Sequence, residues 1–306
     1  MSERFRVALV GCGRIARNHF DAISRVDGLD LVAVADVIPE RAEAAATANG
    51  VPAFASLEAM LANVECDVVT VATPSGLHPV HGIEAARAGK HVVSEKPMAI
   101  SLAGADALID ACAESGVSLF VVKQNRLNPA IQLVKRAVQK GRFGRIHSAN
   151  CTVRWARPQE YYDQAPWRGT WAMDGGAFMN QASHYVDLIQ WLAGPVESVV
   201  AMTATQKRKI EAEDSGAAVL RFQNGAIGVL DVTMLTYPKN LEGSLTILGD
   251  SGSVKIGGTA VNRVDTWLFE DYDDDDKLIE SAATTPPTVY GFGHQGYYQN
   301  VLRVLR

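Results

Sequence analysis

The amino-acid sequence predicts an α/β protein with two domains: a doubly wound parallel sheet in residues 1–122, and an α+β domain with a large, mainly antiparallel open sheet in residues 123–306. Short apolar strands alternate with amphipathic helices up to Val122, and longer alternating strands follow. Gly11 and Gly13 come directly after the first strand, as in nucleotide-binding turns. With 306 residues, 47% of them hydrophobic, the chain can build two cores.

The first half consists of repeated strand–helix units. The predicted strands cover residues 7–10, 31–35, 68–72, 91–94 and 118–122, and helices begin near Arg14, Pro39, Leu77 and Ser101. Ser101 is a suitable N-cap, and Gly89 and Gly116 stand where helices end. Because a helix separates each strand from the next, we expect the strands to be parallel.

The second half has longer strands with alternating apolar residues. We predict helices over residues 128–140 and 177–193, and strands over residues 145–155, 196–205, 217–222, 226–233, 244–248 and 261–269. Asn224-Gly225 predicts a hairpin, and Asp250-Ser251-Gly252 a second turn. The acidic run 271–277 is interpreted as a solvated turn. The last helical pattern has no stop signal, which is compatible with a further segment after Arg306.

Composition and charge exclude several classes of function. The net charge of −5 provides no basic field for nucleic acid. No apolar run approaches the ~18 residues of a membrane span, so we expect no membrane association. The four cysteines have no metal-ligand or redox spacing, which is typical of buried thiols in a reducing cytoplasm. We therefore predict a cytoplasmic protein without a metal site.

The first strand–helix junction carries a dinucleotide-binding fingerprint. In Gly11-Cys12-Gly13-Arg14-Ile15-Ala16, Gly11 permits a tight turn, Gly13 lets a pyrophosphate approach the backbone, and Ala16 allows close packing of helix and strand. Asp36 ends the second strand, where a carboxylate accepts hydrogen bonds from ribose hydroxyls and repels a 2′-phosphate. The sequence predicts NAD as cofactor, and the nearby Arg41 leaves use of NADP open.

Two further segments follow strands that end at the same edge of the sheet. Thr73-Pro74-Ser75 and His78 follow the third strand and either line the cofactor crevice or form an ordinary strand-to-helix turn. Glu95-Lys96-Pro97 follows the strand 91–94, and Pro97 restricts the conformation of Lys96. Because ligands of open α/β sheets bind beyond the carboxyl ends of the strands, Lys96 is a candidate for chemistry.

The predicted helix 177–193 offers a second reactive group. A spacing of four places Asn180 and His184 on one helix face, with Ser183 beside them. Gly175-Gly176 would let a cofactor or substrate approach the backbone ahead of this helix. The alternative is a structural histidine in a satisfied environment.

Taken together, the fingerprint, Glu95-Lys96-Pro97 and the Gly-Gly segment before His184 resemble the Gfo/Idh/MocA family of oxidoreductases over essentially the whole chain. The resemblance implies a Rossmann domain followed by a substrate-binding and oligomerisation domain, with sugar-type substrates oxidised by a nicotinamide. It places Lys96 and His184 at the reacting carbon. Relatives commonly have an aspartate where this chain has Asn180, so a charge-paired histidine is in question here.

Four segments (123–126, 154–162, 167–169 and 180–184) resemble a branch of the family that acts on a UDP-linked N-acetylglucosaminuronic acid. This implies NAD-dependent oxidation of the sugar 3-hydroxyl in the synthesis of bacterial O-antigen and lipopolysaccharide, with 2-oxoglutarate as a second substrate in some relatives and a homotetrameric assembly. The resemblance assigns Asn125, Trp167 and Arg168, with Glu95 and Lys96, to the cofactor. It assigns Arg154, Arg157, Tyr161, Asn180 and Ser183, with Lys96 and His184, to the substrate.

The roles of the two reactive residues remain alternatives at this point. His184 is the favoured general base because the ordinary pKa of histidine, about 6.5, suits neutral operation, whereas a charged Lys96 would stabilise the developing alkoxide. The reverse assignment stays open. A different sugar or polyol dehydrogenase, such as one acting on inositol, and a non-catalytic NAD(H) sensor are the competing functions.

Overall fold

The computed structural model describes residues 3–284 and 293–306, and the chain forms two compact units. The first unit contains the described residues up to Val122, Ala172–Asp174 and His294–Arg306. The second contains Lys123–Trp171 and the described residues from Gly175 to Gly293. The sequence-based boundary assigned all of residues 123–306 to one domain. Two short segments, Ala172–Asp174 and His294–Arg306, instead pack with the first unit. The sequence could not show this, because a periodic pattern indicates an apolar face but not the element that covers it.

The first unit is built on a six-stranded parallel sheet, as predicted. Its strands are β1 Phe5–Val10, β2 Leu29–Ala35, β3 Ala53–Phe54, β4 Val68–Val71, β5 His91–Ser94 and β6 Leu119–Val121. The order β3-β2-β1-β4-β5-β6 places the point where the strand order reverses between β1 and β4. The two-residue strand β3 was not predicted, because two residues are too few to show a period.

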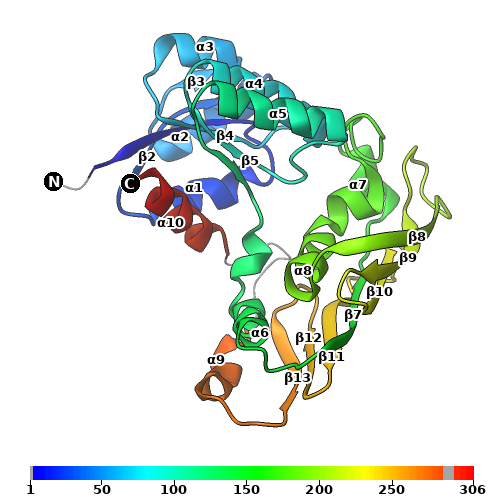
Figure 1. Ribbon diagram of the computed structural model, residues 1–306. Coiled ribbons are helices and arrows are strands. Elements are labelled where there is room, and N and C mark those ends of the chain that lie inside the picture. The colour runs from blue at the N-terminus through cyan, green and yellow to red at the C-terminus, as the bar shows by residue number, and fades with distance from the viewer. Residues whose placement is uncertain (1–2, 285–292) are drawn as a thin grey trace. The chain divides into compact units, whose positions relative to one another are not determined.

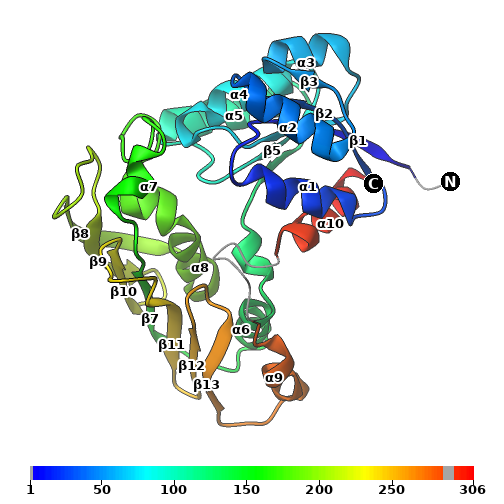
Figure 2. The same cartoon turned by 180° about the vertical axis from the view of Figure 1, so that it is seen from behind.

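Helices cover both faces of this sheet. They are α1 Ala16–Ser24, α2 Pro39–Asn49, α3 Leu57–Asn63, α4 His78–Arg87, α5 Leu102–Glu114 and α10 Gly293–Leu305. Helix α10 lies beside α1 on one face, and α4 and α5 lie against each other on the opposite face (Figures 1 and 2). Gly82 permits the close packing of α4 on α5, since a Cβ there would lie 2.6 Å from Leu108 Cδ1.

The C-terminal helix α10 is an integral part of the first unit. Tyr298, Val301 and Leu302 are buried, in agreement with the apolar face expected from the sequence. A Cβ at Gly28 would lie 3.0 Å from Leu302 Cδ2, so the turn before β2 closes against this helix.

The second unit contains a seven-stranded sheet in the order β13-β12-β11-β7-β10-β9-β8. The strands are β7 Ile146–Arg154, β8 Val196–Ala204, β9 Ser215–Phe222, β10 Ile227–Thr233, β11 Glu242–Gly249, β12 Gly252–Gly257 and β13 Arg263–Phe269. All pairs are antiparallel except β10 with β7. The hairpin at Asn224-Gly225 and the turn at Asp250–Gly252 are confirmed by the pairing of β9 with β10 and of β11 with β12. Strand β12 was not predicted.

One face of this sheet is covered and the other is exposed. The remaining helices are α6 Pro129–Gln139, α7 Gln159–Asp163, α8 Ser183–Ala193 and α9 Ile279–Ala282. Residues of α6 and α8, among them Ile131 and Leu188, form a core with inward residues of the sheet such as Val153 and Leu245. The opposite face has a run of exposed apolar side chains, namely Val200, Met202, Val219, Ile227 and Val229. In the part of the chain that the structure describes, no helix is long and apolar enough to cross a bilayer.

The acidic run 271–277 is more than the solvated turn that its composition indicated. It forms a short 3₁₀ helix, Asp274–Leu278, with a capping box between Asp273 and Asp276. Asp276 accepts hydrogen bonds from Arg142 Nη1 at 2.6 Å and from Trp267 Nε1 at 2.7 Å. The hydrogen bond from Arg142 lowers the pKa of Asp276 to about 2, against the burial that would raise it. Charge composition alone could not show that the matching cations lie more than 130 residues earlier in the sequence.

Replacing Asp276 by asparagine removes its ion pair with Arg142 and should lower the free energy of unfolding by about 1 to 2 kcal/mol near pH 7. The effect is smaller than the pKa shift alone would give, because solvent reaches part of the ion pair. The lowered pKa means that the contribution is present above about pH 4 and is lost as the pH falls toward 2. Urea unfolding from pH 3 to 7 should therefore show wild type and variant converging at the acidic end. The exposed Asp274→Asn is the matched control, with little change expected.

Candidate functional site

The glycine-rich loop after β1 has the geometry of a dinucleotide-binding turn. Gly11 has φ +96°, and a Cβ there would lie 2.6 Å from the backbone of Ala72 and Thr73. Only glycine therefore fits, because the loop crosses the end of β4 in contact with its backbone. A Cβ at Gly13 would meet nothing within 4 Å, so space is open in front of this position. Helix α1 begins without a side-chain cap, so no side chain occupies the place of a phosphate at its first turn.

Asp36 is held beside this loop by two backbone donors. Its Oδ2 accepts a hydrogen bond from Cys12 N–H at 2.8 Å, and its Oδ1 accepts one from Ile38 N–H at 2.9 Å. Each oxygen keeps a second lone pair for a ribose hydroxyl. Burial beside this carboxylate raises the pKa of the Cys12 thiol to about 12, so the thiol stays neutral. These residues fit the adenosine side of NAD. The predicted neighbours Arg14 and Ile15 lie in the turn that leads into α1.

The loop after β4 brings Thr73, Pro74, Ser75 and His78 to the same sheet edge. Ser75 and His78 are buried. His78 bridges two loops, since its Nδ1 lies 2.7 Å from the carbonyl oxygen of Pro97 and its Nε2 lies 2.8 Å from that of Thr73. Its ring therefore ties the end of β4 to the end of β5. Segment 172–174 joins this unit through the hydrogen bond from Gly76 N–H to the Met173 carbonyl.

Glu95-Lys96-Pro97 follows β5 as predicted, with a cis peptide bond between Lys96 and Pro97. Glu95 is buried and Lys96 is half-buried. Lys96 N–H donates a hydrogen bond to Glu95 Oε2 at 2.9 Å. The backbone of the candidate reactive lysine is therefore fixed by the side chain that precedes it.

In the second unit, His184 lies in the first turn of α8 and is buried. Its Nε2 lies 3.1 Å from the Nε2 of Gln124, which belongs to a 3₁₀ turn spanning Gln124–Leu127 with Asn125 beside it. The ring nitrogen accepts from the amide in this rotamer and would donate to the amide oxygen after rotation of the amide. Either arrangement fits a neutral imidazole whose orientation is set by Gln124.

The helix predicted over residues 177–193 is interrupted. Residues Ala177–Gln181 form a π-helical turn, and α8 begins only at Ser183. The argument from a spacing of four therefore does not apply directly to Asn180 and His184, because a π turn changes the angle between successive residues. Ser183 Oγ donates to the Asn180 carbonyl at 3.2 Å across the junction. Such π turns are frequent at functional sites.

Gly176 has a structural partner within the second unit. Its φ is +82°, and a Cβ would lie 2.1 Å from Glu213 Oε2. Glu213 Oε1 accepts a hydrogen bond from Phe178 N–H at 2.9 Å. The glycine thus admits a buried carboxylate to the start of the π turn, which is a different reason from the approach of a cofactor or substrate inferred from sequence.

The predicted substrate cations occupy two different environments. Arg154 pairs with Asp231 at 2.5 Å and with Glu242 at 3.5 Å on the sheet surface, so nearby carboxylates balance its charge. Arg157 donates to Gln181 Oε1 at 3.0 Å, and Gln181 in turn donates to the Tyr161 hydroxyl at 3.0 Å. The Gln181 amide therefore links Arg157 to Tyr161.

Arg168 extends this polar and aromatic cluster. Its guanidinium carbon lies 4.3 Å from the Tyr161 ring centre and 4.8 Å from that of Trp167. An open pocket of about 630 Å³ adjoins it, and its lining includes Tyr162, Arg168, Gly169, Lys209 and Glu211. Stacked guanidinium groups beside a pocket suit an anionic ligand with flat rings.

Sequence reasoning missed Gln124 and Gln181 as members of the site. Gln124 stands immediately after the Rossmann strands, a position that could have drawn attention to it, but a glutamine carries no charge and no motif. Gln181 is recognised only through its contacts with Arg157 and Tyr161.

Comparisons with known proteins agree with these arrangements. Residues 5–123 match the model of the oxidoreductase family with an NAD-binding Rossmann fold, and residues 131–255 match the GFO/IDH/MocA C-terminal domain. D-apiose dehydrogenase of Paraburkholderia graminis is 31% identical over 81% of this chain and 68% of its own length. Myo-inositol 2-dehydrogenase of Thermotoga maritima is 29% identical over 74% of this chain and 67% of its own.

Two solved structures are more similar. The WlbA dehydrogenase from Bordetella pertussis in complex with NADH and UDP-GlcNAcA shares 56% identity and a TM-score of 0.96, covering 100% of this chain and 88% of that protein. The WlbA dehydrogenase from Chromobacterium violaceum, also in complex with NADH and UDP-GlcNAcA, shares 52% identity and a TM-score of 0.95, covering 100% of this chain and 87% of that protein.

The two glycines of the turn should respond differently to alanine. Gly13→Ala should keep the stability of wild type but weaken NADH binding at least about tenfold, because the added methyl group fills space that the pyrophosphate needs. Gly11→Ala should lower the free energy of unfolding by more than ~1 kcal/mol, because its Cβ meets backbone. Thermal unfolding and NADH fluorescence titration measure the two effects. A stable Gly13→Ala protein with wild-type affinity would contradict the assignment.

Proposed function

Because this chain belongs to the Gfo/Idh/MocA family of NAD-dependent oxidoreductases, we propose that it oxidises the 3-hydroxyl of a UDP-linked N-acetylglucosaminuronic acid to the 3-keto sugar. The observation that carries this proposal is the 56% identity, over the whole chain, to a dehydrogenase solved with NADH and UDP-GlcNAcA. Identity to the D-apiose dehydrogenase and to two inositol dehydrogenases is much lower, at 29 to 32% over 65 to 81% of the chain.

The cofactor is NAD, held by the first unit. The Gly11–Gly13 turn, with Arg14, Ile15 and the start of α1, would hold the pyrophosphate, and Asp36 would accept hydrogen bonds from the adenosine ribose. The remaining proposed cofactor residues are Thr73, Pro74, Ser75, His78, Glu95, Lys96, Asn125, Trp167 and Arg168. When bound, the nicotinamide supplies the acceptor for the hydride that leaves the sugar carbon.

The chemistry needs one group that takes the hydroxyl proton and one that stabilises the developing alkoxide. We assign the proton to His184, whose neutral ring is oriented by Gln124. Lys96, with its backbone fixed by Glu95, stabilises the negative charge on the oxygen. His184 takes the O–H proton as the carbonyl forms, and bound NAD would accept the hydride from the sugar carbon. Asn180 carries no charge, so it cannot pair with an imidazolium at His184 as an aspartate in its place could.

The substrate carries two phosphates and a carboxylate, and therefore needs cations. Arg157 and Arg168, stacked with Tyr161, are the proposed contacts, and the pocket beside Arg168 provides room for a ring. Ser183 is a further proposed contact. Arg154 is a weaker candidate, because Asp231 and Glu242 already balance its charge.

The wider setting follows from the same assignment. We place the reaction in the synthesis of bacterial O-antigen and lipopolysaccharide sugars in the cytoplasm, where the four free cysteines stay reduced. The exposed apolar face formed by β8, β9 and β10 supports assembly into a homo-oligomer, proposed to be a tetramer. A second substrate, 2-oxoglutarate, would reoxidise the cofactor in place.

A substrate panel tests the proposed function directly. Purified protein with NAD should produce NADH absorbance with UDP-GlcNAcA at a higher kcat/KM than with myo-inositol. Faster reaction with inositol would identify a polyol dehydrogenase instead, and binding of NADH without reduction by any sugar would identify a sensor. If NADH stays bound after the sugar is oxidised, adding 2-oxoglutarate should remove the NADH absorbance, and no NADH should be released into solution.

The assignment of the base can be tested by single-turnover hydride transfer. His184→Asn should slow the transfer by about 100-fold or more, because the proton acceptor is lost. Lys96→Met should slow it by a similar factor through loss of charge stabilisation, but should keep the pH dependence that His184 contributes. The exposed His147→Asn is the control. A near-normal rate of hydride transfer in His184→Asn would mean that Lys96, and not His184, is the base.

A further inference from the structure

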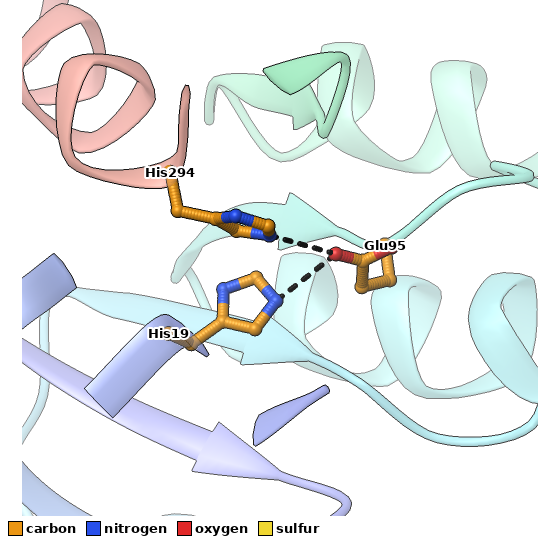
Figure 3. A group of neighbouring side chains, drawn as sticks. All are labelled: His19, Glu95 and His294. Atoms are coloured by element: carbon orange, nitrogen blue, oxygen red, sulfur yellow. Dashed lines mark hydrogen bonds and ion pairs between the residues drawn. The ribbon is translucent and has the colours of Figure 1, made fainter. Parts of the chain in front are cut away.

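A buried chain of hydrogen bonds ends at Glu95, and the reaction itself does not use it. Glu95 is 4% exposed at the end of β5, and it faces His19 of α1 and His294 of α10 (Figure 3). His19 is fully buried and also contacts Tyr298 of α10, which contacts Thr70 of β4. Four elements of the first unit therefore converge on the residue that precedes Lys96.

The protonation states in this chain follow from simple donor and acceptor rules. Burial would raise the pKa of Glu95, but hydrogen bonds from the histidines hold it well below its usual range, so the group is a carboxylate. Burial lowers the pKa of His19, so its ring is neutral and has a single N–H. A carboxylate can only accept, so His19 Nε2–H donates to Glu95 Oε1 at 3.1 Å.

The remaining hydrogen bonds then have a fixed direction. His19 Nδ1 must accept, so the Tyr298 hydroxyl donates to it at 2.9 Å. The Thr70 hydroxyl in turn donates to the Tyr298 oxygen at 2.9 Å. The chain thus runs from Thr70 through Tyr298 and His19 to Glu95, and every proton points toward the carboxylate.

The other end of the carboxylate meets the candidate reactive residue. Glu95 Oε2 accepts the hydrogen bond from Lys96 N–H at 2.9 Å. On the far side of Lys96, the carbonyl of Pro97 is held by His78 at 2.7 Å. Both backbone neighbours of Lys96 are therefore fixed by buried imidazoles, neither of which belongs to the proposed reacting pair.

We propose that Glu95, His19 and Tyr298 are positioning residues for Lys96. Helix α10, which carries Tyr298, then contributes to the active site. The proposal rests on the proposed role of Lys96 in the reaction. The buried Glu95 carboxylate is oriented by the Nε2–H of His19, and it fixes the direction of the Lys96 backbone by accepting the Lys96 N–H. Displacement of a reacting group by about 1 Å can cost roughly 100-fold in rate.

A metal ion is the competing explanation of the same cluster. Donor atoms of His19, Glu95 and His294 all lie within 4.8 Å of one another. The 3.1 Å contact between His19 Nε2 and Glu95 Oε1 is already a hydrogen bond, however. His294 Nε2 lies 3.7 Å from the same oxygen, so the two imidazoles surround the carboxylate without an ion. Stoichiometric zinc in protein purified without chelator would therefore overturn the proposal.

Substitutions of His19 separate positioning from packing. His19→Ala should slow single-turnover hydride transfer from UDP-GlcNAcA by about 10- to 100-fold with little change in the KM for NAD. His19→Gln, whose amide nitrogen can replace Nε2, should restore most of the rate, whereas His19→Asn, whose amide is too short, should not. A purely structural role would give Gln and Asn the same rate per folded molecule, and that result would overturn the proposal.

The two adjacent tyrosines of α10 give a milder, matched pair. Tyr298→Phe removes the donor to His19 Nδ1 and should slow hydride transfer about 3- to 10-fold. Tyr297→Phe, whose hydroxyl is outside this chain of hydrogen bonds, should keep the wild-type rate. Equal rates for both variants would contradict a role for the tautomer of His19.

Nitrogen-15 NMR of the histidine rings tests the chain of hydrogen bonds without any substrate. Wild type should show His19 as the Nε2–H tautomer, and Tyr298→Phe should increase the Nδ1–H form. A wild-type Nδ1–H tautomer would overturn the proposal even if UDP-GlcNAcA is oxidised. Failure of wild type to oxidise UDP-GlcNAcA, with the expected tautomer present, would instead overturn the proposed substrate, and the His19 series would then be measured with whichever sugar of the panel reacts.

Discussion

The meeting of β1, β4 and β5 at one edge of the parallel sheet is the constraint on which the first unit depends. The strand order reverses between β1 and β4, so their following loops lie side by side. Gly11 lets these loops touch at backbone distance, since a Cβ there would lie 2.6 Å from the end of β4. His78 then ties the β4 loop to the β5 loop. The cofactor turn and the candidate lysine are thus parts of one packed edge.

Buried carboxylates at this edge accept hydrogen bonds from backbone N–H groups and, at Glu95, also from an imidazole ring. Asp36 accepts from two backbone N–H groups, and Glu95 accepts from Lys96 N–H and from the His19 ring. A carboxylate satisfied in this way stays ionised and fixes the direction of the chain around it.

In the second unit, a π turn and side-chain networks position the candidate site residues. A π-helical turn precedes His184, Gln124 orients its ring, and Gln181 links Arg157 to Tyr161. Glutamines with these roles leave no signal in a single sequence, because their function comes from contacts between segments that are 20 to 60 residues apart. The Gly175-Gly176 pair was visible in the sequence, but its partner Glu213 was not.

The sequence by itself determined the parallel sheet, the mainly antiparallel sheet, the dinucleotide turn, Asp36 and the placement of Lys96 after β5. These features depend on local patterns: strand–helix alternation, glycine spacing and the position of a residue at a strand end. Only the tertiary structure decided that α10 packs on the first unit, that the acidic run pairs with distant cations, and that Tyr298 contacts His19, which in turn contacts Glu95. Those features depend on which buried faces and polar groups meet after folding, and a periodic pattern indicates that a face is buried without identifying its partner.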